Sequence, residues 1–143
     1  MKFQHEVEIQ APIDAVYSFV TDHARMAEWI TTLEASTPAE GFQWRPGAQF
    51  QQVHVEQGKR LEFEGVVKTA DENRFIELEL EHKDATLFIA YRFEESSAGT
   101  RFEHTSNVEL KSMMLRMMAK AFVPQVQARV EADVEKAKQM IEG

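Results

Sequence analysis

The stretch that decides the fold is residues 9–30, which read IQAPIDAVYSFVTDHARMAEWI. Pro12 ends the preceding segment and suits the first turn of a helix, because proline lacks the N–H that a helix interior needs. Asp14 places a negative charge near the positive end of that helix. Apolar side chains follow at helical spacing, and Asp22 can cap a second short helix that Trp29 closes. The stretch therefore predicts two short helices in succession.

The residues before this stretch alternate between apolar and polar side chains. Alternation with a period of two is typical of a strand that buries one face. The first strand therefore leads directly into the two helices. Its inward parity holds Phe3, His5, Val7 and Ile9, and its outward parity holds Lys2, Gln4, Glu6 and Glu8.

The middle of the chain repeats the same alternation between turn signals rich in Gly, Asn, Asp and Ser. The predicted strands cover residues 49–56, 59–69, 74–82, 85–94 and 99–110. Four of them have one clear apolar face. For strand 49–56 two orientations remain open, with either Val53 and Val55 or Phe50 and His54 pointing inward.

Closing each turn with its shortest plausible hairpin tests whether these apolar faces agree. With those turns, every apolar face lands on the same side of one sheet. Because a slip of one residue would turn a whole strand over, the agreement supports one antiparallel sheet. The predicted cross-strand pairs are Val67 with Ile76, Leu80 with Leu87, and Tyr91 with Phe102.

The chain ends in one long helical segment, residues 112–142. Ser112 is a plausible N-cap, and Pro124 predicts a bend because it removes one backbone hydrogen bond. At ~1.5 Å per residue the segment would run ~46 Å, long enough to cross the sheet. The apolar stripe at three- and four-residue steps is Leu115, Ala119, Phe122, Val126, Val130, Val134, Ala137 and Ile141.

Composition excludes several classes of function. A chain of 143 residues with a net charge of −8 predicts one domain, 1–143, and argues against a nucleic-acid partner. The chain has no cysteine, which excludes disulfides and thiol catalysis. Its His, Asp and Glu residues show no clear metal-ligand spacing. No apolar run approaches the ~20 residues of a membrane span, and no signal peptide is apparent. We expect a cytoplasmic protein with no cofactor, no metal and no stable membrane insertion.

The order of elements, with APIDAVYSFVTD at 11–22, Trp29 and RPGAQF at 45–50, resembles the helix-grip superfamily. That group includes the polyketide cyclase/dehydrase and lipid-transport family, START domains and the birch-pollen allergen. The resemblance implies an α+β fold. In it, a curved antiparallel sheet of about six to seven strands wraps round the C-terminal helix, and two short helices follow the first strand. It also implies a cavity between sheet and helix for an apolar or aromatic small molecule.

Polar residues on the apolar parity are the candidates for chemistry. The predicted register places His104 in mid-sheet opposite Ile89, and Ser106 opposite Leu87. A histidine in a cavity can act as a general base or a hydrogen-bond donor near neutral pH. A single inward histidine is nevertheless most often structural. His104 and Tyr91 are the best catalytic candidates, and whether His5 and His54 face the cavity is left open.

The cavity wall is expected to combine side chains from facing strands with others from the C-terminal helix. The methionine-rich run KSMMLRMMAK at 111–120 suits an adaptable pocket wall or mouth, or ordinary core filling with some exposed methionine. Trp29 either packs under the short helices or lines one end of the cavity, and Trp44 is either a lid or an edge cap. The expected ligand-binding residues are Trp29, Phe63, Leu78, Ile89, Tyr91, Phe102, His104, Met114, Met118 and Phe122.

Three classes of function remain. The first is binding, and possible carriage, of an apolar or aromatic small molecule. The second is a cyclase- or dehydratase-like enzyme that uses the cavity His and Tyr as acid–base groups. The third is a protein-interaction module. Binding is favoured, because no set of nucleophile, base and orienting residue is apparent. The expected assembly is a monomer or weak homodimer.

Overall fold

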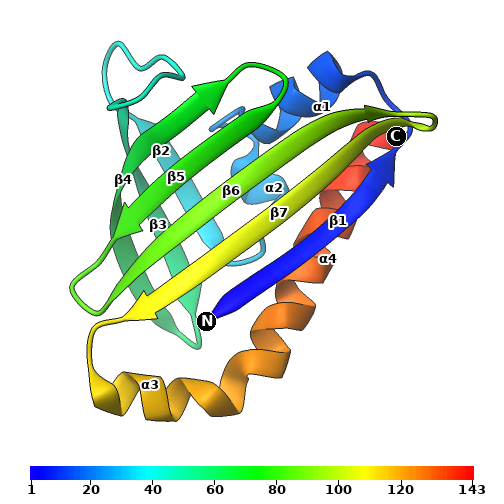
Figure 1. The fold of residues 1–143 in the computed structure, drawn as a ribbon. Helices are drawn as coiled ribbons and strands as arrows, with labels where there is room; N and C mark the ends of the chain where they lie inside the picture. The colour runs from blue at the N-terminus through cyan, green and yellow to red at the C-terminus, as the bar shows by residue number, and fades with distance from the viewer.

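The computed structural model describes residues 1–143 and contains one curved, seven-stranded antiparallel sheet (Figure 1). The spatial order of the strands is β1-β7-β6-β5-β4-β3-β2, and each neighbouring pair is antiparallel. The predicted fold class is therefore confirmed. The strands are β1 (Lys2–Ile9), β2 (Leu33–Pro38), β3 (Gln49–Glu56), β4 (Lys59–Asp71), β5 (Phe75–Glu81), β6 (Ala85–Ser96) and β7 (Gly99–Leu110).

The two short helices follow β1 as the opening stretch predicts. Pro12 is the N-cap of α1 (Ile13–Val20), and the buried face of α1 carries the apolar stripe. The second helix, α2 (Met26–Trp29), begins later than predicted, with Arg25 as its N-cap. Asp22 instead supports the turn before it, because its carboxylate accepts a hydrogen bond from the Ala24 N–H at 3.1 Å.

The C-terminal segment bends where Pro124 predicts a bend. It divides into α3 (Met113–Ala119), a short 3-10 turn η1 (Lys120–Phe122) and α4 (Val123–Glu142). Ser112 caps α3 by accepting a hydrogen bond from the Leu115 N–H at 3.1 Å. Pro124 lies in the first turn of α4, where its missing N–H leaves no helical bond unmade.

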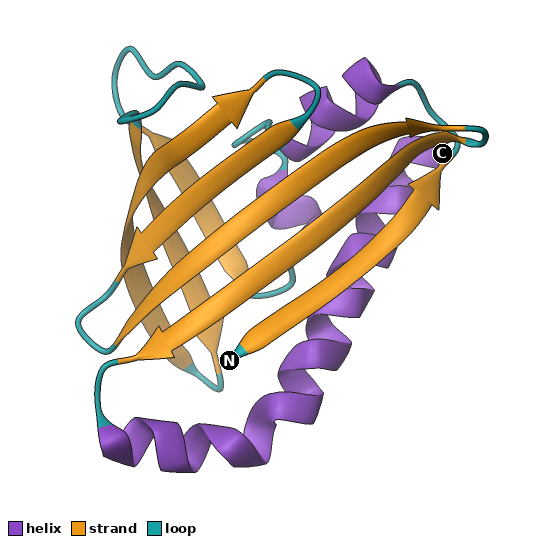
Figure 2. Cartoon of the chain, viewed as in Figure 1, coloured by secondary structure: helices purple, strands orange, loops and turns teal.

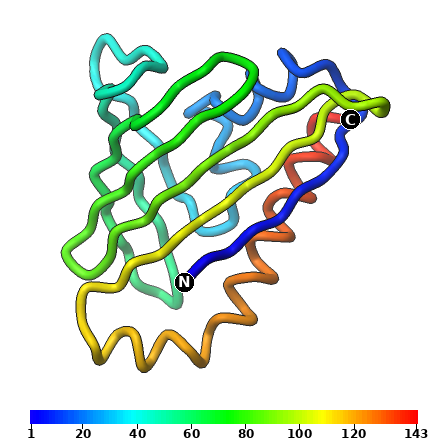
Figure 3. Tube along the Cα trace, in the orientation of Figure 1, coloured from blue at the N-terminus to red at the C-terminus, as the bar shows by residue number.

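Helix α4 closes the concave side of the sheet. Gln127 donates to the Gln4 carbonyl in β1 at 2.9 Å, and Arg129 pairs with Glu56 at the end of β3. The helix thus contacts the edge strand β1 and also β3, the strand next to the opposite edge, and it lies alongside β1 (Figure 3). Figure 2 shows α1, α2 and α4 on the same side of the strands, whereas α3 lies beyond the strand ends. The predicted crossing of the concave face by residues 112–142 is confirmed for α4, whereas α3 turns away from the sheet.

Two of the three predicted hairpin registers are displaced by two residues, and only Leu80 with Leu87 is correct. The β4–β5 turn is longer than the shortest hairpin, with Asn73 in the left-handed region (φ 64°), and a bulge interrupts β4 after Val67. A displacement of two residues preserves the alternation, so every apolar face still points inward. The observed pairs, which correct the predicted ones, are Val67–Leu78, Tyr91–His104, Phe93–Phe102 and Ile89–Ser106.

Strand β2 is absent from the predicted strands, because its residues do not alternate. Only Leu33 of this edge strand is buried, so no periodic apolar signal marks it. The orientation of β3 is also resolved. Phe50 and Gln52 point inward and are almost fully buried, whereas Val55 is 43% exposed.

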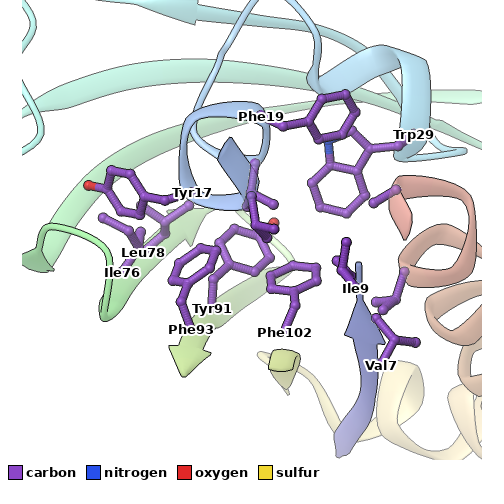
Figure 4. Packing of buried hydrophobic residues seen from close by; sticks show 14 of the residues in the cluster. Val7, Ile9, Tyr17, Phe19, Trp29, Ile76, Leu78, Tyr91, Phe93 and Phe102 are labelled. Carbon is purple, nitrogen blue, oxygen red and sulfur yellow. The ribbon is translucent and has the colours of Figure 1, made fainter. Parts of the chain in front are cut away.

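The main apolar core lies between the short helices and the sheet. In Figure 4 the short helices supply Tyr17, Phe19 and Trp29 from one side, and the sheet supplies aromatic rings from the other. Trp29 is fully buried, with its ring 6.4 Å from Phe102 in an edge-on arrangement. This packing fills one end of the concave side.

Candidate functional site

The other end of the concave side holds a cavity of about 620 Å³ between the sheet and the α3–α4 segment. Its wall is mainly apolar. Because α3 and η1 turn away from the sheet before α4 returns to it, the strands and the helices do not close against each other here (Figure 1). The predicted ligand-binding residues that line the cavity are Phe63, Leu78, Ile89, Tyr91, His104 and Phe122.

Four other predicted residues do not line this cavity. Trp29 and Phe102 are fully buried in the core beside α1 and α2, so they lie behind the cavity rather than on its surface. Met114 and Met118 point into solvent, with 71% and 57% of their surface exposed. The inward face of α3 carries Leu115 instead.

Solvent-exposed residues mark the mouth of the cavity. Gln57 lies in the β3–β4 turn, Lys59 follows that turn, and Asp84 lies in the β5–β6 turn. Phe122, in η1, is 38% exposed and faces these turns across the opening. The mouth therefore lies between two hairpin tips and the α3–η1 segment.

His104 is the most unusual polar residue of the wall. It is 8% exposed, and neither ring nitrogen has a hydrogen-bond partner within the protein. Its ring lies edge-on to Tyr91, with 5.2 Å between the centroids. Burial lowers the pKa of His104 to about 4, so the ring is neutral at physiological pH. Each unpartnered buried group costs about 1–3 kcal/mol, and a polar group that reached these nitrogens would find no competing partner within the protein.

Asp133 of α4 faces the same cavity and is 5% exposed. One of its oxygens, Oδ1, accepts hydrogen bonds from the backbone N–H and the hydroxyl of Thr31. Burial raises the pKa of Asp133, against the effect of those hydrogen bonds. Burial also raises the pKa of Tyr91, and the nearby Asp133 carboxylate adds to that shift. Asp133 and Tyr91 thus add an acceptor and a neutral hydroxyl to the cavity.

A second polar group lies on β3. The Thr32 hydroxyl is 2.8 Å from His54 Nδ1, and Gln52 Oε1 is 3.0 Å from His54 Nε2. Because the amide oxygen can only accept, Nε2 is the donor, and Nδ1 then accepts from Thr32. Burial lowers the pKa of His54 to about 4, which fits this neutral ring. Unlike His104, His54 is satisfied within the protein.

A family model described as "Polyketide cyclase / dehydrase and lipid transport" matches residues 1–142. The chain belongs to this family. A search of curated proteins finds no match.

Solved structures with low sequence identity share the helix-grip fold of this family member. Protein TTHA0849 from Thermus thermophilus is 19% identical, with 99% of this chain and 97% of that chain covered and a TM-score of 0.80. The Zhui aromatase/cyclase from Streptomyces sp. R1128 is 16% identical, with 99% and 93% covered and a TM-score of 0.80. Ara h 8.0201 is 13% identical, with 99% and 97% covered and a TM-score of 0.66. At these identities the likeness shows the fold alone.

Of the other inward-facing histidines, His82 lines the cavity and His5 does not. His82 lines the cavity near its mouth, with its ring centroid 5.3 Å from that of Phe63. His5 points toward α4, where its Nε2 lies 3.1 Å from a carboxylate oxygen of Glu135, and it does not line the cavity. Of the two alternatives left open, His54 therefore reaches the cavity and His5 does not.

Trp44 caps an edge of the core. Its ring stacks on His23 with centroids 5.1 Å apart and planes within 8° of parallel. Phe42 meets both rings edge-on, so the loop between β2 and β3 is fixed by aromatic contacts. This loop lies away from the cavity wall.

Sequence reasoning missed the polar residues Asp133, Gln52 and Thr32. Asp133 carried a usable signal, because it lies three residues after Val130 and four before Ala137, on the apolar stripe of the helix. Gln52 shares the parity of Phe50, but the orientation of β3 was open. Thr32 lies between α2 and β2, where no periodicity guides a prediction.

Three further findings concern the rest of the molecule. A hollow of about 1070 Å³ on the outer side of the sheet is larger than the cavity, but charged side chains such as Arg92, Arg101 and Glu103 line most of it. No group of three or more His, Asp or Glu side chains is arranged to hold a metal ion. None of the helices combines the length and the apolar character that crossing a membrane requires.

Proposed function

We propose that this protein binds an apolar or aromatic small molecule that carries at least one hydrogen-bonding group. The ligand occupies the cavity between the sheet and the α3–α4 segment. One observation carries the proposal. His104 is buried on a mainly apolar wall, and both of its ring nitrogens lack a partner within the protein. A ligand that reaches this ring gains a hydrogen bond, and no hydrogen bond of the ring within the protein has to break.

The size of the cavity supports the same class of ligand. A volume of about 620 Å³ lies within the range of about 300–1,000 Å³ that is usual for small-molecule sites. Leu78, Ile89 and Phe63 offer apolar contact, while His104 and Asp133 fix the orientation of polar groups. The family description, which names both cyclases and lipid transport, agrees with such a ligand.

A cyclase- or dehydratase-like enzyme is the second candidate, and Asp133 is the observation that favours it. This carboxyl group, with its raised pKa, shares the cavity with the neutral His104 and Tyr91, so proton donors and acceptors face one space. The Zhui aromatase/cyclase has the same fold. His104, however, has a pKa of about 4 and is a weak base at neutral pH, where a pKa near 7 is optimal. Binding is therefore the better-supported function.

A thermal-shift screen of apolar and aromatic compounds tests the proposal. The proteins compared are the wild type, His104→Ala and His104→Phe, at pH 6 and pH 8, with His5→Ala as a control histidine outside the cavity. Compounds that raise the melting temperature of the wild type and of the control should do so much less in His104→Ala. The Phe variant should reject the larger compounds, because its ring narrows the cavity. Equal shifts in all four proteins would make His104 structural and remove the basis of the proposal.

A further inference from the structure

The outer face of α3 is an exposed apolar surface. Of the exposed large apolar side chains, most lie in or next to this one helix. At about 100° per residue, its methionines occupy one continuous arc, while Leu115 and Ala119 point into the cavity. The methionine face comprises Met113, Met114, Met117 and Met118, which are 72%, 71%, 69% and 57% exposed.

The segment that carries this face is basic, unlike the chain as a whole. The chain carries a net charge of −8, yet no Asp or Glu occurs between Glu109 and Glu131. Within that segment Lys111 pairs with Glu81, whereas Arg116 and Lys120 form no ion pair. These two cations flank the methionine face on the helix.

The orientation of α3 is fixed by contacts at its beginning. Ser112 caps its N-terminus, and the Arg116 guanidinium donates from Nε to the Leu110 carbonyl at 3.0 Å. The methionine face therefore remains turned outward at the end of the molecule away from α1 and α2 (Figure 1). Phe122 extends the apolar surface to the mouth of the cavity.

We propose that the methionine face docks on the surface of an anionic lipid bilayer and places the cavity mouth next to the lipid. Flexible apolar side chains can enter the boundary between headgroups and acyl chains, while Lys and Arg reach the phosphates. Charge complementarity selects this partner. A two-fold dimer through the same face would set the cations of Arg116 and Lys120 against their own copies. This docking does not depend on which ligand the cavity binds, so its test is separate from the test of the proposed function.

Co-sedimentation of the intact protein with vesicles tests this inference. Vesicles of phosphatidylcholine alone are compared with vesicles that contain a quarter phosphatidylglycerol, at low and at physiological salt. We expect binding to the anionic vesicles only, and weaker binding as salt rises. Replacing all four methionines of the face with Gln should reduce binding to background without lowering the melting temperature, because these side chains are exposed. Should that variant fold poorly, the single variant Met114→Gln takes its place, with a partial loss expected.

A pair of charge variants tests whether the position of a cation beside the methionine face matters for vesicle binding, rather than the net charge of the protein alone. Lys120→Gln should weaken binding about fivefold, which corresponds to the ~1 kcal/mol that one basic residue contributes near an anionic surface. Lys136→Gln, which removes an exposed charge from α4, should change nothing. The inference is overturned if the glutamine variant still sediments, if neutral vesicles bind equally well, or if no vesicles bind. It is also overturned if the protein instead self-associates and the glutamine variant is monomeric, since the face would then join two copies.

Discussion

At the scale of single residues, His104 combines burial with hydrogen-bonding atoms that have no partner. Its ring is buried among apolar groups and stays neutral, while its two nitrogens find no partner in the chain. His54 is also neutral, but Thr32 and Gln52 satisfy both of its nitrogens. The two residues have similarly lowered pKa values for the same main reason, yet only His104 offers unused hydrogen bonds to a ligand.

The lowered pKa of His104 predicts that acid destabilises the protein. An unfolded chain protonates this histidine near pH 6.5, whereas the folded chain does so only near pH 4. The unfolded state therefore binds more protons in between, and stability falls as the pH drops through that window. At pH 5 the loss from this one residue should be about 1–2 kcal/mol.

Urea unfolding at pH 8 and pH 5 checks this prediction. The quantity compared is the change in unfolding free energy between the two pH values, so any packing cost of a substitution cancels. His104→Phe should show a smaller acid loss than the wild type. If both proteins lose the same amount, His104 is protonated as easily in the folded state as in the unfolded state.

At the scale of elements, strands β5 and β6 contribute both to the core and to the cavity. Leu80 and Leu87 face each other across these strands, but Leu80 is fully buried whereas Leu87 is partly exposed on the cavity wall. Leu80→Ala should lower the unfolding free energy by about 2–5 kcal/mol, as expected in a packed core. Leu87→Ala should cost less than about 2 kcal/mol, because a side chain on a cavity has fewer contacts to lose.

Denaturant unfolding of the two variants, side by side, provides the measurement. The pair is matched in residue type, sheet and strand register, so the difference between them reports the cavity. Equal and large losses would mean that the space beside Leu87 is filled in solution and that the site is a packed core.

Much of this architecture follows from the alternation of apolar and polar residues along the strands. The errors in the predicted strand registers have local causes. The sequence predicted the inward parity of Val67, Leu80 and Tyr91 correctly because alternation survives a shift by two residues. It could not predict the shift itself, which depends on the conformation of turns such as that at Asn73. A separate shift of two residues between β6 and β7 changes the partner of His104 from Ile89 to Tyr91, so local errors in turns altered the predicted site more than the predicted fold.

At the scale of the whole molecule, the C-terminal α3–α4 segment has two roles. Residues Val130 to Ala137 of α4 seal the concave side, while α3 swings away and leaves the cavity mouth. The bend at Pro124 was predictable because proline acts locally. The outward turn of Met114 and Met118 was not, since helical spacing alone does not say which of several apolar arcs meets the sheet.

The most direct test of the account is a nuclear Overhauser experiment on labelled protein with the strongest-binding compound of the thermal-shift screen. Filtered spectra record only contacts between ligand protons and protein protons. We predict contacts to the methyl groups of Leu78 and Ile89 and to the ring of Phe63, together with a change in the ¹⁵N shifts of His104 on binding. Contacts confined to the methionine methyls of α3, with His104 unchanged, would place the ligand on the surface and contradict a binding cavity.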